Sequence, residues 1–218
     1  MAINNDLGAF TEEDVYRVGG LTITRRALEL CAFVPAARLA DIGCGKGDTV
    51  RFLRAAGFDA HGLDSNAEVT SQAGPYCRTG DARFLPYKAD SMEGLFFECS
   101  LSQMAEPYQV LNEAFRVLRP GGKLVISDLY ARNEELRISS PVQNRTQWLE
   151  LCAKANLPCL LFEDRSDDLK AFSAQLIWQY GIKIPEEVYG CDISALKAAR
   201  CGYFLMVSAK IQSALISE

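Results

Sequence analysis

A run of glycines follows the first apolar stretch of the central part of the chain and has the spacing of a ligand-binding loop. Residues 39–47 read Leu-Ala-Asp-Ile-Gly-Cys-Gly-Lys-Gly, with glycines at positions 43, 45 and 47. Because glycine has no side chain, a backbone rich in it turns tightly and approaches a ligand closely. A helix is predicted directly after the loop, and the free N–H groups of a helix start suit polar or anionic groups. The pattern predicts a cofactor-binding loop.

Two acidic residues follow this loop at positions where a nucleotide could be bound. Asp64 ends the next apolar run, about 20 residues after Gly43, the separation at which a carboxylate meets ribose hydroxyls in a dinucleotide-binding fold. Asp81 lies in a Gly-Asp-Ala sequence after a third predicted strand and could accept a hydrogen bond from an adenine amino group. Asp48 stands where the dinucleotide fingerprint needs its third glycine, which argues against NAD.

Short apolar runs alternate with helical segments and must position these residues. Strands are predicted at 38–42, 60–63, 95–99, 123–127, 159–162 and 202–209. Helices are predicted near 48–56, 108–118, 146–155 and 168–180. This alternation predicts parallel strands joined by right-handed crossovers in a doubly wound α/β sheet, with ligands at the carboxyl ends of the strands. We therefore expect the functional groups just after each strand.

Two further segments have an architectural interpretation. Residues 11–33 show helical periodicity interrupted at Gly19 and Gly20, and Thr22 or Thr24 is predicted to cap the second helical part. This stretch is predicted to form a helical lid. Residues 117–122 read Val-Leu-Arg-Pro-Gly-Gly, which predicts the end of a helix and a turn into a strand.

Composition narrows the class of protein. The chain has 218 residues, of which 49% are hydrophobic and 23% charged, a balance typical of one globular domain. Its formal net charge of −5 disfavours binding to nucleic acid, which requires a basic face. No apolar run reaches the roughly 20 residues that span a bilayer, and the first ten residues lack the features of a signal peptide. We expect a cytoplasmic protein with no membrane association.

The chain has one histidine and eight cysteines, none of them in a CxxC pair, so no metal site is predicted. The cysteines are scattered through apolar stretches, and buried thiols are the favoured interpretation. A minority hypothesis is a set of soft ligands for an arsenite acceptor, drawn from Cys99, Cys152, Cys159, Cys191 and Cys201.

Four motifs, DIGCGKG, GLDSN, GDARFLPY and EAFRVLRPGGKLVISD, occur in one order over residues 38–130. In order and spacing the chain resembles the class I S-adenosylmethionine-dependent methyltransferases, in their small, stand-alone type 11 branch. The resemblance implies a Rossmann-like, mostly parallel seven-stranded sheet of order 3-2-1-4-5-7-6 with an antiparallel last strand. It also implies one domain over 1–218, with a helical lid at 1–36, a cofactor-binding core at 37–130 and substrate-side helices and C-terminal strands at 131–218.

The same resemblance implies the site residues. The loop beside the methionine and ribose parts of the cofactor would consist of Asp41, Gly43, Cys44, Gly45 and Gly47. Asp64 would bind the ribose diol with Ser65 and Asn66 beside it, and Asp81 and Ala82 would contact adenine. Glu98 and Cys99 would lie under the transferable methyl group, and Tyr16, Gly19 and Gly20 would close over the cofactor. As a base we expect Glu98 first, then Asp128 or Tyr130.

The resemblance thus implies methyl transfer from S-adenosylmethionine to a small-molecule acceptor, leaving S-adenosylhomocysteine. Such a transfer is an in-line displacement that depends largely on alignment and exclusion of water. Two alternatives stay open, an NAD-type oxidoreductase and a non-catalytic module that binds the cofactor. The protein is expected to be a monomer or a homodimer, and the sequence does not identify the acceptor atom.

Overall fold

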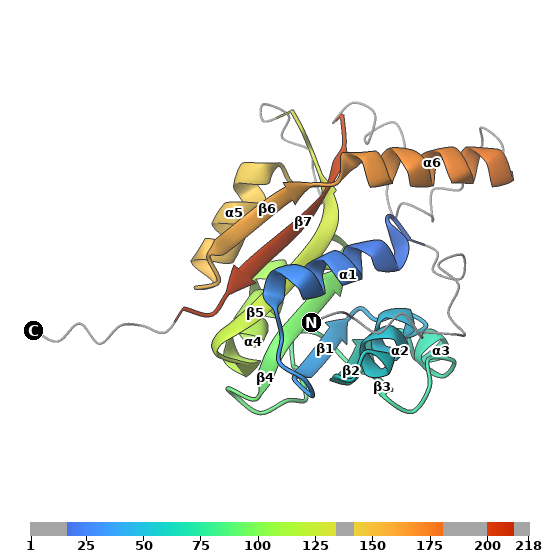
Figure 1. Ribbon diagram of the computed structural model, residues 1–218. Helices are drawn as coiled ribbons and strands as arrows, with labels where there is room; N and C mark the ends of the chain where they lie inside the picture. Colours follow the sequence, from blue (N-terminus) through green and yellow to red (C-terminus); the bar gives the residue numbers. More distant parts are fainter. Residues whose placement is uncertain (1–16, 134–141, 181–199, 212–218) are drawn as a thin grey trace, which may run out of the picture.

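A single seven-stranded sheet organises the computed structural model, which describes residues 17–133, 142–180 and 200–211. Its strands are β1 (Arg38–Ile42), β2 (Asp59–Asp64), β3 (Cys77–Thr79), β4 (Met92–Glu98), β5 (Leu118–Tyr130), β6 (Cys159–Asp164) and β7 (Gly202–Ala209). The sheet order is β3-β2-β1-β4-β5-β7-β6, as predicted (Figure 1). Strands β1 to β5 pair in parallel, and β7 is antiparallel to both β5 and β6.

Helices cover both faces of this sheet (Figure 1). They are α1 (Gly20–Cys31), α2 (Asp48–Ala55), α3 (Ala67–Thr70), α4 (Pro107–Val117), α5 (Arg145–Lys154) and α6 (Ser166–Tyr180). One apolar cluster joins α4 and α5 to the sheet, and a second joins α1, α2 and α6 to the opposite face. The result is the three-layer arrangement expected for strands that alternate with helices.

The strands serve both faces because successive side chains point to opposite sides of a sheet. In β4, Leu95 and Phe97 belong to the cluster with α4 and α5, whereas Phe96 between them packs in the cluster with α1, α2 and α6. Strand β7 is buried along its whole length, since it lies between β5 and β6 with helices on both sides. Near-continuous apolar runs in the sequence therefore mark the central strands.

The start of α1 differs from the prediction. Neither Thr22 nor Thr24 caps the helix, because Gly19 occupies the N-cap position in a left-handed conformation, with φ +68°, and the helix begins at Gly20. Thr24 is buried and its hydroxyl points instead toward the end of β4, where it bonds to Glu98. The glycine pair that interrupts the sequence periodicity thus marks the helix start itself.

The Pro-Gly-Gly segment does not separate a helix from a strand. Strand β5 begins at Leu118 and continues through it, with a register shift against β4 between Met92 and Gly94. The backbone is kept in the sheet because Gly121 donates its N–H to the carbonyl of Lys210 and Gly122 accepts one from the N–H of Lys210. The segment is an irregularity inside a long strand.

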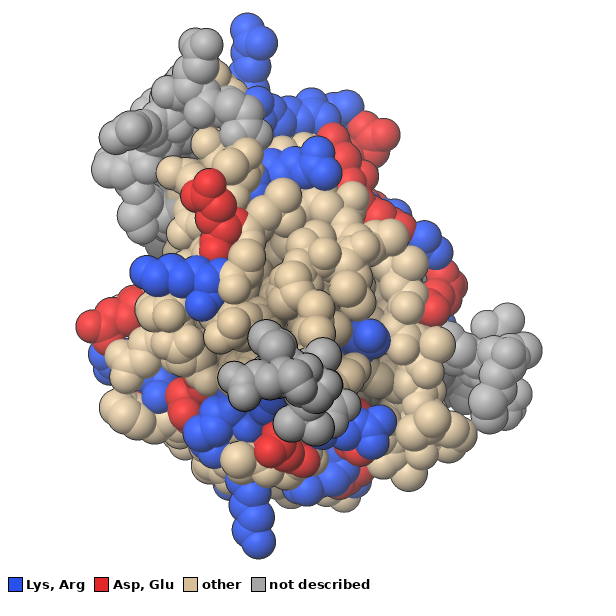
Figure 2. All heavy atoms as spheres, turned by 90° about the vertical axis from the view of Figure 1, so that its left-hand side faces the viewer, with Lys and Arg blue, Asp and Glu red and all other residues tan. Residues whose placement is uncertain are grey.

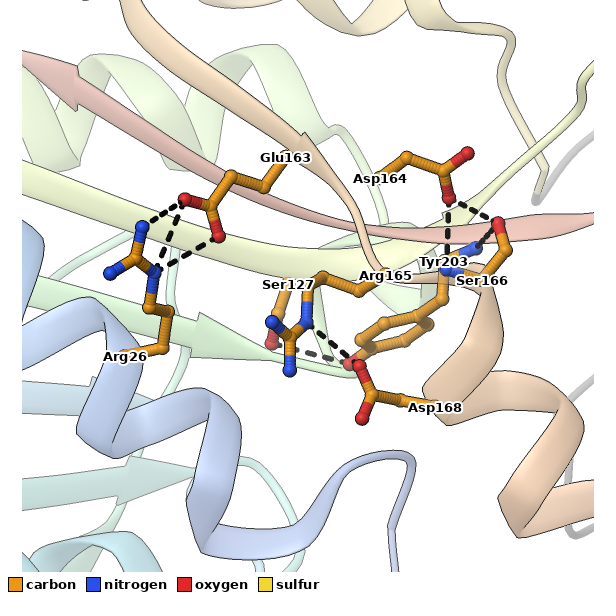
Figure 3. A network of polar contacts seen from close by, with 8 residues as sticks. All are labelled: Arg26, Ser127, Glu163, Asp164, Arg165, Ser166, Asp168 and Tyr203. Atoms are coloured by element: carbon orange, nitrogen blue, oxygen red, sulfur yellow. Dashed lines mark hydrogen bonds and ion pairs between the residues drawn. The ribbon is translucent and has the colours of Figure 1, made fainter.

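Polar contacts tie helix α1 to β6, the last strand in the sheet order (Figure 3). The guanidinium of Arg26 reaches from α1 to Glu163 in β6, with Nη2 2.6 Å from Oε1. Nearby, Asp164 accepts hydrogen bonds from the N–H and hydroxyl of Ser166 at the start of α6. These contacts fix α1 and α6 on the same face of the sheet.

Figure 2 shows the side of the molecule that lies to the left in Figure 1, where basic and acidic side chains border a broad uncharged centre. Both signs of charge are interspersed around it, so this side presents no uniformly basic surface. Of the helices within the described ranges, none is long and apolar enough to cross a membrane.

Candidate functional site

A pocket of about 390 Å³ opens at the carboxyl ends of β1, β2 and β4. The chain runs from β1 outward to β2 and β3, then returns to place β4 on the other side of β1. This is the switch point at which doubly wound sheets bind ligands. Its lining includes Gly43, Asp64, Ser65, Asp81, Ala82 and Cys99, all predicted from the sequence.

The glycine loop has conformations that require glycine. Gly43, Gly45 and Gly47 all have positive φ, at +79°, +50° and +77°. A Cβ on Gly43 would lie 2.4 Å from the Cβ of Ser100, whose hydroxyl donates to the carbonyl of Ile42 at 2.7 Å. The start of the loop therefore packs directly against the segment that follows β4, and the pocket lies against this bare backbone.

Asp64 shapes the loop from the end of β2. One carboxylate oxygen accepts the N–H of Gly45 at 2.9 Å, and the other accepts the N–H of Asn66 at 2.9 Å. The side chain of Asn66 caps the short helix α3 by accepting the N–H groups of Glu68 and Val69. Asp64 thus faces the pocket and holds the glycine loop, whereas the Asn66 side chain serves α3.

Asp81 lies on the pocket wall and is paired with a residue that the sequence analysis did not single out. Arg83 donates to both carboxylate oxygens of Asp81, through Nε to Oδ1 and through Nη2 to Oδ2 at 2.7 Å, and also pairs with Glu106. These bonds lower the pKa of Asp81 below its usual value. The carboxylate is therefore ionised, and its orientation is held by Arg83, which lines the same pocket.

Asp41 is a buried acid next to the pocket with an unsatisfied atom. It is 3% exposed, and its Oδ1 has no hydrogen-bond partner among the described residues. Burial and the nearby Glu98 raise its pKa well above the ordinary value. A buried acceptor of this kind is costly unless a ligand satisfies it. With the positive-φ glycines beside it, it fits a cofactor that brings a cationic donor, as the methionine ammonium group of S-adenosylmethionine does.

Glu98 is held in a closed polar cluster. Its two carboxylate oxygens accept the hydroxyls of Thr24, at 2.9 Å, and Thr49, at 2.6 Å. Arg17 completes the cluster with its Nη2 2.8 Å from Oε2 of Glu98. Burial alone would lower the pKa of Arg17, but Glu98 together with Cys99, Asp41 and Tyr203 more than offsets this effect, and the pKa is raised. The cluster joins the first part of the described chain and α1 to the end of β4 and the start of α2.

Cys99 directly follows Glu98 and lines the pocket in a left-handed conformation, with φ +56°. Its sulfur lies 2.8 Å from the hydroxyl of Tyr203, which donates to Ser127 at 3.2 Å. Burial and the nearby Asp128 raise the pKa of the thiol to about 12. Because a non-glycine residue is strained at this φ, the fold holds Cys99 in the pocket wall at some cost.

The two other predicted bases lie outside the pocket lining. Asp128 is buried and accepts from the N–H and hydroxyl of Ser102 and the N–H of Leu129. Its pKa is raised to about 6 by burial. Tyr130 is 7% exposed and packs edge-on against Phe162 and Phe204 in the apolar cluster.

Gly19 and Gly20 lie at the start of α1, outside the lining of the pocket. Tyr16, and Cys191 of the arsenite hypothesis, lie outside the described residues. In the described ranges no three histidine, cysteine or acidic side chains gather as a metal site. Sequence reasoning did not predict that Arg17, Thr24 and Thr49 surround Glu98; Thr24 was expected only as a helix cap. It also missed Gln103, Met104 and Ala105 of the pocket wall, which have no motif.

Comparisons with known proteins agree with this geometry. A family model described as a methyltransferase domain matches residues 40–126, from β1 into β5. A ubiquinone/menaquinone biosynthesis C-methyltransferase of Ruegeria sp. is 32% identical over 130 residues, which are 52% of this chain and 51% of the relative. The chain thus spans about half the length of that curated relative.

Two solved structures share the fold over most of the chain. A geranyl diphosphate methyltransferase in complex with S-adenosylmethionine has a TM-score of 0.74 at 16% identity, covering 88% of this chain and 86% of that one. A [4+2]-cyclase, SpnF, has a TM-score of 0.70 at 22% identity, covering 93% and 85%.

A sheet of this order with a glycine loop after β1 and an acid ending β2 defines the class I, Rossmann-like methyltransferase fold. Residues 40–126 of the chain match a methyltransferase domain, and the matched segment contains the loop and both acids that line the pocket.

Proposed function

We propose that this protein transfers a methyl group from S-adenosylmethionine to a small-molecule acceptor. The observation that supports this most directly is the pocket at the switch point, where Gly43, Asp64 and Asp81 line one cavity. In size it falls within the range of small-molecule sites, which are roughly 300 to 1,000 Å³.

We assign the cofactor contacts as follows. Asp64 would bind the ribose hydroxyls while it holds the N–H of Gly45. Asp81 and Ala82 would contact the adenine, with Arg83 fixing the direction of the Asp81 carboxylate. Oδ1 of Asp41, which has no hydrogen-bond partner among the described residues, would accept a hydrogen bond from the ammonium group of the methionine part.

When bound, S-adenosylmethionine supplies an electrophilic methyl group on a sulfonium. The protein's own residues then have to align the acceptor with that methyl group and exclude water. Cys99 and Ser100 at the end of β4, together with Gln103 and Met104, form the part of the pocket wall on which an acceptor would rest.

The predicted base Glu98 is best assigned a positioning role. Both oxygens of its carboxylate are occupied by Thr24, Thr49 and Arg17, and it is not among the residues that line the pocket. Within the described residues, the carboxylates that line the pocket are Asp64 and Asp81, both assigned to the cofactor. This favours an acceptor that is nucleophilic without a carboxylate base.

The fold alone does not fix the reaction, since one structure that shares it is a cyclase. A non-catalytic cofactor-binding module and an NAD-type oxidoreductase are the competing functions. Asp48 at the start of α2, where the dinucleotide fingerprint needs its third glycine, favours S-adenosylmethionine over NAD.

Calorimetric titration of the full chain with S-adenosylmethionine and S-adenosylhomocysteine, with NADH as the control, tests the cofactor class. Micromolar binding of the first two and none of NADH supports the proposal, and the reverse pattern refutes it. Transfer of radiolabelled methyl to members of an acceptor panel then separates an enzyme from a binding module.

A further inference from the structure

Two cysteines meet directly beneath the glycine loop. Cys44 lies inside the loop, and Cys77 begins β3, which pairs with β2 so that Cys77 faces Gly62. A Cβ placed on Gly62 would lie 2.7 Å from each of the two sulfurs. The Cys44 and Cys77 side chains are hydrogen-bonded to each other, and only a glycine at position 62 leaves room for this contact.

The two thiols differ in acidity and access. The hydrogen bond from Cys44 lowers the pKa of Cys77, burial opposes it and the nearby Arg51 adds to the lowering. The same bond, with burial, raises the pKa of Cys44. Cys77 is half-buried and Cys44 is 7% exposed. A partly exposed thiol of lowered pKa next to a second thiol is the arrangement found in redox-sensitive cysteine pairs.

Another buried cysteine lacks this combination. Cys31 is 9% exposed, and burial raises its pKa to about 12. It lies in the apolar cluster under α1, on the side of the sheet that α2 and α6 also cover. Cys31 therefore serves as an internal reference for a thiol that should resist oxidation.

We propose that Cys44 and Cys77 are a modification site at which a peroxide forms a disulfide that switches the cofactor loop. The Cys77 thiolate attacks one peroxide oxygen, so that an S–O bond forms, the O–O bond breaks and the leaving hydroxide takes up a proton as water. The Cys44 sulfur then attacks the Cys77 sulfenic acid, the S–S bond forms, the S–O bond breaks and a second water leaves. Two thiols are oxidised and one hydrogen peroxide is reduced to two waters, and a thiol reductant reverses the change.

The expected effect on the cofactor, which rests on the proposed function, follows from the place of Cys44 in the loop. A disulfide holds its sulfurs at about 2.05 Å, much closer than two thiols in contact. Closing the distance between the two sulfurs is expected to draw Cys44 toward β3, because Cys77 is held in that strand, and to displace Gly43 and Gly45 on either side of Cys44. The bond from Gly45 to Asp64, 2.9 Å long, crosses this segment and would be disturbed. Losing one bond to a charged group weakens S-adenosylhomocysteine binding by about tenfold or more.

The test treats the full chain with hydrogen peroxide or with dithiothreitol. Peptide mapping by mass spectrometry under non-reducing conditions should show the Cys44 and Cys77 peptides joined, with a loss of two hydrogens. Calorimetry should show S-adenosylhomocysteine bound at least about tenfold more weakly after oxidation, with recovery after reduction. Cys77→Ser should abolish both changes, whereas Cys31→Ser should preserve both.

Each failure is informative. Oxidised protein in which Cys44 and Cys77 remain thiols, or become separate sulfinic acids, overturns the proposed site, and this readout needs neither cofactor nor variant. A joined pair with unchanged S-adenosylhomocysteine affinity overturns the switch. If the reduced protein does not bind S-adenosylhomocysteine at all, the proposed function fails, while the mapping still decides whether the pair forms a disulfide.

Discussion

Arg17 and Glu98 form an ion pair inside the protein, with Nη2 of the guanidinium 2.8 Å from Oε2 of the carboxylate. The side chains are 16% and 1% exposed, so water screens the pair little. One partner lies at the start of α1 and the other at the end of β4, beside the pocket. The position of helix α1 is therefore coupled to the strand end on which the acceptor is proposed to rest.

Replacing Glu98 with Gln should destabilise the protein strongly. The substitution keeps the shape but leaves the buried Arg17 without its counter-charge, and removing one partner of a buried pair costs about 3–5 kcal/mol. Urea unfolding measures the loss. Asp167→Asn is the control, because its pair with Lys170 is exposed and its loss should leave stability nearly unchanged. A Glu98→Gln variant as stable as the wild type would contradict the structural role.

Replacing Asp64 with Ala should weaken cofactor binding. The change removes the acceptor of the Gly45 N–H and the proposed ribose contact, at a cost of about 1–3 kcal/mol in affinity for S-adenosylhomocysteine. Calorimetry measures it. Asp59→Ala, at the other end of the same strand and paired with exposed or half-buried side chains, should leave the affinity unchanged. Equal affinities for the two variants would remove Asp64 from the site.

Replacing Gly43 with Ala should damage both binding and stability. An alanine there has an unfavourable φ of +79° and a Cβ 2.4 Å from that of Ser100. Gly57 has a similar φ of +89° with nothing near the Cβ position, so Gly57→Ala separates backbone strain from the clash. We expect Gly57→Ala to cost about 1 kcal/mol of stability, within the range for left-handed alanine, and to keep S-adenosylhomocysteine binding. Retained binding in Gly43→Ala would show that the loop does not contact the cofactor.

Asp128 should make stability depend on pH. Its pKa is raised to about 6 in the folded protein from an ordinary value of 3.8. Well below pH 3.8 the group is protonated in both the folded and the unfolded state, and its contribution to stability does not change with pH. As the pH rises toward 6 the unfolded chain releases this proton more readily than the folded one, so the group's contribution to stability is lost, by at most about 1.4 kcal/mol per pH unit.

Urea unfolding of the wild type and Asp128→Asn between pH 4 and 7 measures this effect. The wild type should lose stability relative to the variant up to about pH 6, and the difference should then level off. A constant difference across this range would mean that the pKa of Asp128 is not raised in the folded protein.

The sequence predicted the sheet well because apolar runs locate the strands and the order of the motifs indicates a family with a known strand order. The bounds of β1 and β7 match the predicted 38–42 and 202–209, and the order with its antiparallel last strand is confirmed. The start of α1 was predicted wrongly, because a left-handed glycine replaced the expected threonine cap. The Pro-Gly-Gly segment was expected to be a turn, but pairing with Lys210, distant in sequence, keeps it in the strand.

The candidate site was predictable where a motif spans it and unpredictable where partners come from distant segments. Gly43, Asp64 and Asp81 lie in the pocket as the motifs indicated. The partners of Glu98 could not be predicted from the sequence, because Thr24 and Thr49 belong to two different helices and only the packing of α1 and α2 brings these residues together. Asp128 and Tyr130 were expected after the fifth strand, but β5 extends to Tyr130, and both side chains are buried outside the pocket lining.

The central place of β7 sets the order in which the protein can finish folding. Strand β7 is hydrogen-bonded to β5 on one side and to β6 on the other, and β6 has no other sheet neighbour among the described strands. While the chain is being synthesised, β5 and β6 are both made before the strand that joins them. Until β7 inserts, β5 has an open, apolar edge prone to pairing with other chains. Release of residues 202–209 from the ribosome is thus the step that closes the sheet.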